Sequence, residues 1–140
     1  MVLLKIIRRL NLYSLELRRK ELMEKLSDGC EEYAWELDLI DTLLKLGEEE
    51  GEVEYFEENY VAYDPTVHSK LFSENTIRLL EVLNKGVNSV SEVAVKLGRD
   101  KANVWKDIMW LRNLGFVVTL REGNRVKPVP LVIEYGLVFD

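Results

Sequence analysis

The chain has little of several residue types on which common functions depend. Its 140 residues include one cysteine, one histidine and three prolines. A single cysteine, Cys30, excludes an internal disulfide and a cysteine-based zinc site, and it is typical of a protein in a reducing cytoplasm. His68 stands alone, so we interpret it as a loop histidine and not as a metal ligand. We expect neither a metal nor a cofactor.

Long hydrophobic runs and catalytic motifs are absent as well. The most apolar stretch, Val2 to Leu10, contains three basic residues and falls short of the roughly 18–20 residues that span a bilayer. No small-residue cleavage site follows it, so a secretory signal is not expected. The sequence has no phosphate-binding glycine loop and no His-Glu-x-x-His helix, and its acidic residues isolate no catalytic pair. These absences predict a cytoplasmic protein that is not an enzyme and does not bind membranes.

The charge is distributed unevenly along the chain. The formal net charge is −6, with 47 % hydrophobic and 31 % charged residues, and a chain of this length and composition can bury a globular core. Residues 28–64 carry fourteen acidic residues and one basic residue, whereas residues 96–127 carry eight basic and three acidic residues. Segregation of this kind indicates one end that binds a polyanion, despite the negative total.

The first 64 residues are predicted to form a helical, acidic domain. Leucines at helical spacing between Leu12 and Leu26 follow an apolar lead-in and indicate a first helix. Asp28 and Glu31 have the spacing of a capping box, which predicts a second helix from near Gly29 to Leu46, with Gly47 as its stop. The wide apolar faces of these helices predict that residues 1–46 form a homodimer. Residues 53–63 are rich in tyrosine, phenylalanine and valine and are predicted to be extended.

Residues 65–140 are predicted to form the second domain, with three helices and a hairpin. Three residues are predicted helix N-caps, and a glycine ends each helix: Ser73 with Gly86, Ser89 with Gly98, and Asp100 with Gly115. Two strands, 116–120 and 125–133, flank a turn at 121–124. Prolines at 128 and 130 predict that the second strand lies at a sheet edge or ends early.

This order of elements is that of a winged helix-turn-helix domain. Only three residues, Gly98 to Asp100, separate the second helix from the third, which is the spacing expected when one helix presents the next to the DNA major groove. The predicted fold class is therefore α+β and mainly helical. It combines a C-terminal winged helix-turn-helix domain with an N-terminal two-helix segment.

The third helix, 101–114, and the turn at 121–125 supply the candidate DNA-binding residues. On a helix with 100° per residue, Val104, Ile108 and Leu111 face the core. Asn103 can read an adenine edge, and Lys106 can reach a guanine or a phosphate. The full candidate set is Arg99, Lys101, Ala102, Asn103, Trp105, Lys106, Arg121, Asn124 and Arg125. Residues at the helix start suit phosphate contacts, and those in the turn suit the backbone or the minor groove.

Part of the chain resembles a known group of proteins. The stretch from Ser89 to Ile108 reads SVSEVAVKLGRDKANVWKDI, and it is followed by Leu-Gly-Phe-Val from Leu114 and by Arg-Val-Lys-Pro-Val-Pro from Arg125. This stretch is similar to archaeal predicted transcriptional regulators of the MarR-like winged-helix superfamily. The resemblance covers about residues 70–135. It implies sequence-specific, dimeric DNA binding with contacts at Lys101, Asn103, Trp105, Lys106 and the wing.

Two functions from different classes are consistent with these features. The first is a regulator that binds double-stranded DNA as a homodimer. The alternative is a protein-interaction module, an adaptor or an antitoxin-like inhibitor, that uses the winged helix or the acidic segment 28–64 to bind a protein partner. That acidic segment could also imitate DNA and mask the basic surface.

Overall fold

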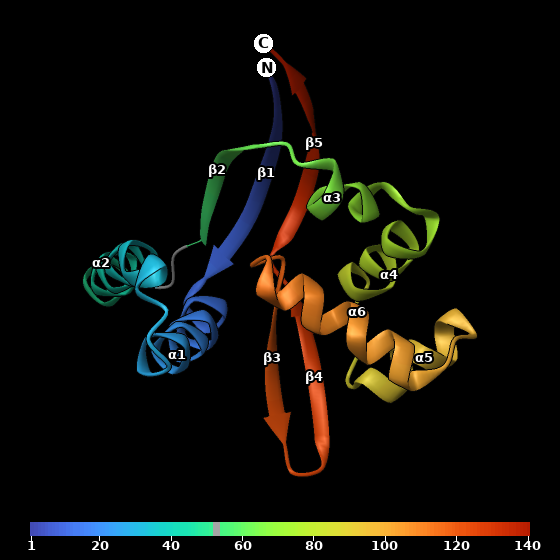
Figure 1. The fold of residues 1–140 in the computed structure, drawn as a ribbon. Coiled ribbons are helices and arrows are strands. Elements are labelled where there is room, and N and C mark those ends of the chain that lie inside the picture. Colours follow the sequence, from blue (N-terminus) through green and yellow to red (C-terminus); the bar gives the residue numbers. More distant parts are fainter. Residues whose placement is uncertain (52–53) are drawn as a thin grey trace. The chain divides into compact units, whose positions relative to one another are not determined.

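A computed structural model describes residues 1–51 and 54–140 (Figure 1). The chain divides into two compact units, Arg9–Phe56 and the combination of Met1–Arg8 with Glu57–Asp140, and each is described by itself. Across the described parts, the elements are helices and small antiparallel sheets, which confirms the α+β class. No helix in these parts is long and apolar enough to cross a membrane. The domain boundary predicted between residues 64 and 65 stays a prediction.

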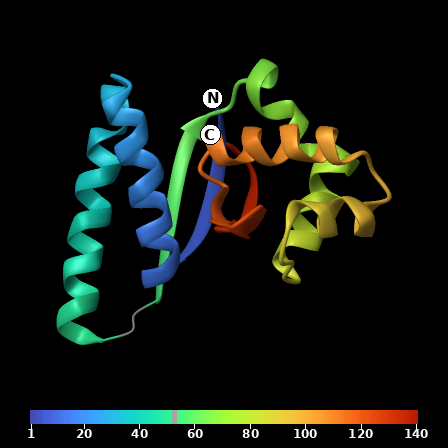
Figure 2. The same ribbon diagram turned by 90° about the horizontal axis from the view of Figure 1, so that it is seen from below.

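The first unit is built from α1 (Leu12–Ser27) and α2 (Ala34–Glu50), which lie side by side (Figures 1 and 2) and are joined through η1 (Glu31–Tyr33). A reciprocal capping box between Asn11 and Ser14 starts α1, with hydrogen bonds of 2.8 and 2.9 Å. The side chains of Leu15, Leu22 and Ile40 are buried. These apolar contacts hold the two helices together.

The second helix begins and ends at other residues than predicted: it runs from Ala34 to Glu50 and not from near Gly29 to Leu46. Asp28 is the C-cap of α1 and does not start a helix, and Gly29 takes a positive φ of 88°. Helix α2 passes through Gly47, which is buried against the side chain of Leu12, and a Cβ atom there would require that side chain to shift. The helix ends at Gly51, again with φ of 88°. Gly47 therefore permits a close helix contact, which sequence spacing cannot distinguish from a helix stop.

The chain begins with a strand, so the expectation of a helical segment from the start is wrong. Strand β1 (Val2–Asn11) occupies the predicted apolar lead-in. Within it Leu4, Arg8 and Leu10 are buried, and they lie at even spacings that place them on one face of a strand. Its partner is β5 (Val132–Phe139), more than a hundred residues away in sequence. That distance is why local patterns gave no sign of the pairing.

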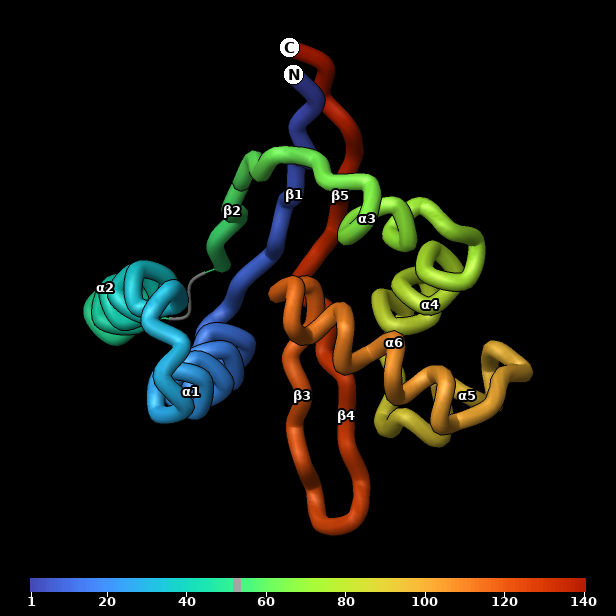
Figure 3. Tube along the Cα trace, viewed as in Figure 1, coloured from blue at the N-terminus to red at the C-terminus, as the bar shows by residue number. Residues whose placement is uncertain are grey.

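Strands β2 (Glu54–Ala62), β1 and β5 form a three-stranded sheet in the order β2-β1-β5. Strand β2 confirms the predicted extended segment from residue 54 onward, while the predicted start at Val53 lies outside the described residues. The two chain termini lie side by side (Figure 3). There the Met1 amine donates a hydrogen bond of 2.8 Å to the carbonyl of Asp140, and the Asp140 amide donates one of 2.9 Å to the carbonyl of Met1.

The remaining elements follow the predicted order. They are α3 (Pro65–His68), η2 (Ser69–Phe72), α4 (Glu74–Asn84), α5 (Val90–Leu97), α6 (Lys101–Asn113), β3 (Val117–Glu122) and β4 (Arg125–Pro130). Ser73, Ser89 and Asp100 are the N-caps of α4, α5 and α6, as predicted. The predicted strand 125–133 ends early, at Pro130, because proline cannot donate to a ladder. A single core of buried leucine, valine and isoleucine side chains, with Phe116, connects these helices to both sheets.

Candidate nucleic-acid interface

Helix α5 is short, and its ends are held by specific contacts. The Ser89 hydroxyl accepts a hydrogen bond of 3.1 Å from the Glu92 amide. The Glu92 carboxylate in turn accepts one of 2.7 Å from the Asn88 amide, and this bond, with help from Lys96, lowers the pKa of Glu92. At the other end, Gly98 adopts the left-handed conformation with φ of 62°, which glycine tolerates best. The chain thus turns sharply into α6.

Helix α6 has one buried face and one exposed face. The predicted core residues Val104, Ile108 and Leu111 are completely buried. Asp100 caps the helix by accepting a hydrogen bond of 3.3 Å from the Asn103 amide. The exposed side chains belong to Lys101, Ala102, Asn103, Lys106 and Asn113. The face that the sequence assigned to DNA is therefore open to solvent.

Strands β3 and β4 form a two-stranded antiparallel hairpin. Glu122 pairs with Arg125, so Gly123 and Asn124 make the turn, and Gly123 has a positive φ of 60°. This is the two-residue hairpin geometry that glycine and asparagine favour. Arg121, Asn124 and Arg125 are all exposed at this tip.

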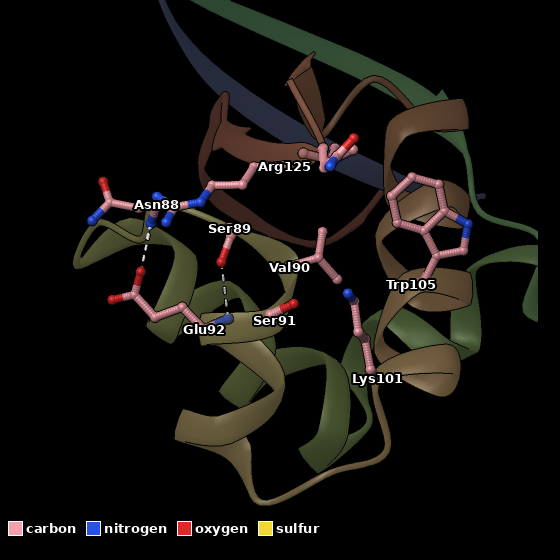
Figure 4. Close-up of a pocket in the computed structure, with 10 residues that line it drawn as sticks. Asn88, Ser89, Val90, Ser91, Glu92, Lys101, Trp105 and Arg125 are labelled. Carbon is pink, nitrogen blue, oxygen red and sulfur yellow. Dashed lines mark hydrogen bonds between the residues drawn. The ribbon is translucent and has the colours of Figure 1, made fainter. Parts of the chain in front are cut away.

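A groove of about 550 Å³ lies between the start of α5, the start of α6 and the hairpin turn. The structure brings four of the predicted site residues together along it: Lys101, Trp105, Asn124 and Arg125. In Figure 4, Lys101 and Trp105 project from α6, and Arg125 extends from the hairpin toward Asn88. Ala102, Asn103, Lys106 and Arg121 are exposed but do not line this groove.

Sequence reasoning missed part of the groove. Its remaining wall comes from the start of α5 and the two residues before it, Asn88 to Glu92, and from Val126 of β4. The capping pattern of Ser89 and Glu92 did identify a helix start. It contained no sign that this start faces the hairpin, because that proximity depends on packing between elements distant in sequence.

Arg99 has a different environment from the other candidates. Its Nη2 donates a hydrogen bond of 2.7 Å to one carboxylate oxygen of Asp107, and Lys70 Nζ donates one of 2.7 Å to the other. Burial raises the pKa of Asp107, but the hydrogen bonds and charges of Lys70 and Arg99 outweigh it, so that the pKa lies below its ordinary value. Lys70 also lies 4.7 Å from the ring centre of Trp110. Arg99 is thus already bound to another side chain of the protein.

The cations of α6 and the hairpin differ from most others in their pairing. Elsewhere, basic side chains form ion pairs with nearby acids, as Lys5 does with Glu58 and Lys96 with Glu92. Within residues 1–51 and 54–140, no ion pair involves the following residues: Lys101, Lys106, Arg121, Arg125 and Lys127. Their positive charge is therefore not neutralised by the described part of the protein.

The described residues contain no group of three or more histidine, cysteine, aspartate or glutamate side chains that could hold a metal ion. The groove is lined mostly by polar residues, with two basic residues, Lys101 and Arg125, and one aromatic residue, Trp105. Hydrogen-bond donors from Lys101, Asn124 and Arg125 line the same groove as the half-buried ring of Trp105. Such a surface can bind an anion and stack on a planar group.

Part of the chain matches a known protein family. A family model described as HVO_A0114 matches residues 71–132, which is less than half of the chain. The matched segment runs from Leu71 through α4, α5, α6 and the hairpin to the first residue of β5. No curated protein matches the chain.

Proposed function

We propose that the protein is a transcriptional regulator that binds double-stranded DNA. In this proposal, α4, α5, α6, β3 and β4 form a winged helix-turn-helix of the MarR-like kind. Helix α6 enters the major groove, and the hairpin turn at 121–125 contacts the adjacent backbone or minor groove. The order of the elements and the tight turn at Gly98–Asp100 support this assignment.

The observation that carries the proposal is the set of cations without acidic partners on α6 and the hairpin. Exposed ion pairs add little stability, but they are frequent on the other elements of the described chain. No described ion pair involves Lys101, Lys106, Arg121, Arg125 or Lys127. Unpaired lysines and arginines can neutralise phosphates and release counterions from DNA, which supplies most of the binding energy. The overall net charge of −6 does not prevent this, because the interaction is local.

The exposed residues of α6 have distinct roles in this proposal. Asn103 can pair with an adenine edge and Lys106 with guanine or phosphate, while the small side chain of Ala102 allows close approach to the bases. Lys101 and Arg125 lie along one groove and suit the DNA backbone. Arg99 is bound to Asp107, so we assign it to holding the start of α6 in place.

Binding to DNA can be tested with a random duplex pool and fluorescence anisotropy at two salt concentrations. We expect an enriched sequence and an affinity that falls steeply with salt. Lys106→Ala and Arg125→Ala should each weaken binding and reduce the salt slope by about one. Lys85→Ala is the matched control, because Lys85 is exposed but lies on α4 and is paired with Glu81 at 3.2 Å.

The proposal fails if no sequence is enriched and duplex affinity stays weaker than about 100 μM at low salt, the upper end of ordinary non-specific binding. It also fails if Lys85→Ala weakens binding as much as Lys106→Ala does. Either result would favour a protein-interaction module instead.

A further inference from the structure

The three-stranded sheet ends on one side at β5, and no strand of the described residues pairs with the outer edge of β5. Met1 and Asp140 exchange two backbone hydrogen bonds. Because hydrogen-bonded pairs alternate along an antiparallel ladder, Tyr135, Leu137 and Phe139 direct their amide and carbonyl groups away from β1. Within residues 1–51 and 54–140, no backbone group is hydrogen-bonded to this outer edge. In Figure 1, this part of β5 runs beyond α3 and α4.

The side chains of this edge are mostly apolar and exposed. Phe139 is 77 % exposed and Leu137 37 %, and Glu134 is the only charged residue in β5. The opposite edge strand of the same sheet, β2, carries three glutamates. Charges, prolines and bulges are the usual protection of sheet edges. The one irregularity in β5 lies next to Glu134, at Ile133, and leaves 134–139 regular.

We propose that a second copy of this chain pairs with this edge, β5 against β5, in antiparallel orientation about a two-fold axis at Gly136. The edge is complementary to itself, because residues with outward amide and carbonyl groups then pair with each other: Tyr135 with the partner's Leu137, and Leu137 with the partner's Tyr135. Charge selects this register. Here Glu134 faces an uncharged valine, whereas a shift of the axis to residue 137 would place Glu134 opposite the partner's Asp140.

A groove beside β5 fits the same arrangement. It has a volume of about 340 Å³ and is lined mainly by apolar side chains, among them Phe72, Ile77, Leu80 and Ile133. Directly opposite residues of an antiparallel pair project to the same face of the sheet. In the proposed register, Phe139 of the second copy lies opposite Ile133 and therefore at this groove. The most exposed aromatic ring of the strand thus gains an apolar environment.

Sedimentation of the full chain tests this pairing independently of DNA binding. We expect a mass of twice the 16.3 kDa chain at micromolar concentration. Leu137→Pro removes one outward amide from each copy and leaves the hydrogen bonds to β1 intact, since proline is tolerated where the missing donor faces outward. It should raise the dimer dissociation constant by more than about tenfold. Phe139→Lys should have the same effect through charge and lost apolar contact.

Two controls separate this surface from others. Trp35→Glu alters the most exposed apolar residue of α2, 61 % exposed, and should leave the dimer intact. Circular dichroism and thermal melting establish that each variant is folded. A monomeric wild-type chain overturns the proposal. So does a dimer that persists in folded Leu137→Pro and Phe139→Lys, or one that Trp35→Glu alone dissociates, which would place the contact in residues 1–46.

Discussion

Replacing Asp107 with alanine should destabilise the protein by about 2–3 kcal/mol. The carboxylate is 11 % exposed and accepts hydrogen bonds of 2.7 Å from Lys70 and from Arg99. Lys70 is 50 % exposed, so its pair is close to a surface ion pair, worth about 1 kcal/mol or less. Arg99 is 22 % exposed, and a charged hydrogen bond in such a place contributes about 1.5–3 kcal/mol. Arg99 also has a buried Nη1 without a hydrogen-bond partner, so losing Asp107 would leave the guanidinium still less satisfied.

Urea denaturation measures this loss as a lower midpoint at an unchanged slope. The matched control is Glu81→Ala, because Glu81 and Lys85 form a pair that is more than half exposed on both sides. This control should cost about 0.5 kcal/mol or less. A double-mutant cycle should give a larger coupling for Asp107 with Arg99 than with Lys70. If Asp107→Ala costs no more than Glu81→Ala, the ion-pair cluster does not hold α6 and the reasoning is refuted.

The same carboxylate predicts how stability depends on pH. The pKa of Asp107 is lower in the folded protein than its ordinary value of 3.8. Its contribution is therefore fully present above that value and is lost as the pH falls from there through the folded-state pKa. The difference in free energy of unfolding between wild type and Asp107→Asn should be constant near neutral pH and shrink below about pH 4. A difference that stays constant on acidification would contradict the assignment.

Three further substitutions test the helices, with urea denaturation as the measurement. Gly98→Ala should cost about 1–2 kcal/mol, because φ of 62° is unfavourable for a residue with a Cβ atom; an unchanged midpoint would show that the turn relaxes. Gly47→Ala should change the midpoint little, because the added Cβ meets only the terminal methyl of the Leu12 side chain, which can move, and alanine gains about 0.5–1 kcal/mol over glycine inside a helix. Gly123→Ala, with open space around it, should show only the cost of its positive φ. Arg18→Ala should cost about 3–5 kcal/mol by leaving the buried Glu36 without its 3.0 Å partner. Because the buried Glu21 also lies 3.5 Å from Arg18, the matched replacement is the triple variant Arg18→Met/Glu21→Gln/Glu36→Leu. It should recover most of that loss, and failure to recover it would show that the ion-pair cluster is worth more than apolar packing.

The C-terminal elements could be predicted from sequence because their signals are local. Ser73, Ser89 and Asp100 act through amides three residues away, and the glycine after α5 acts on the turn that it belongs to. The buried face of α6 follows from helical periodicity alone. Strand β1 could not be found in this way. It is stabilised by pairing with β5, and its apolar residues fit a helix as readily as a strand until that partner is known.

Long-range contacts also decide which candidate residues remain available. Arg99 has the right position in sequence for a phosphate contact, but Asp107, eight residues further on, and Lys70, on another element, determine its environment. Lys106 and Arg125 have no such partner among the described residues. The sequence assigned Arg99, Lys106 and Arg125 to one surface, because a sequence shows which residues are charged but not which of them form ion pairs in the fold.

The difference between paired and unpaired charges also explains why the net charge of −6 is a poor guide to DNA binding. Several acids between residues 54 and 58 are paired with basic residues of β1, at 2.8 Å for Glu57 with Arg8 and 3.1 Å for Glu58 with Lys5. The basic residues of the chain's start are therefore largely neutralised, whereas Lys106 and Arg125 are in no ion pair of the described residues. Salt screens charges beyond about 8–10 Å, so a polyanion near α6 senses the local cations more than the total. The salt slope of Lys106→Ala, and not the isoelectric point of the chain, is thus the quantity that reports on DNA binding.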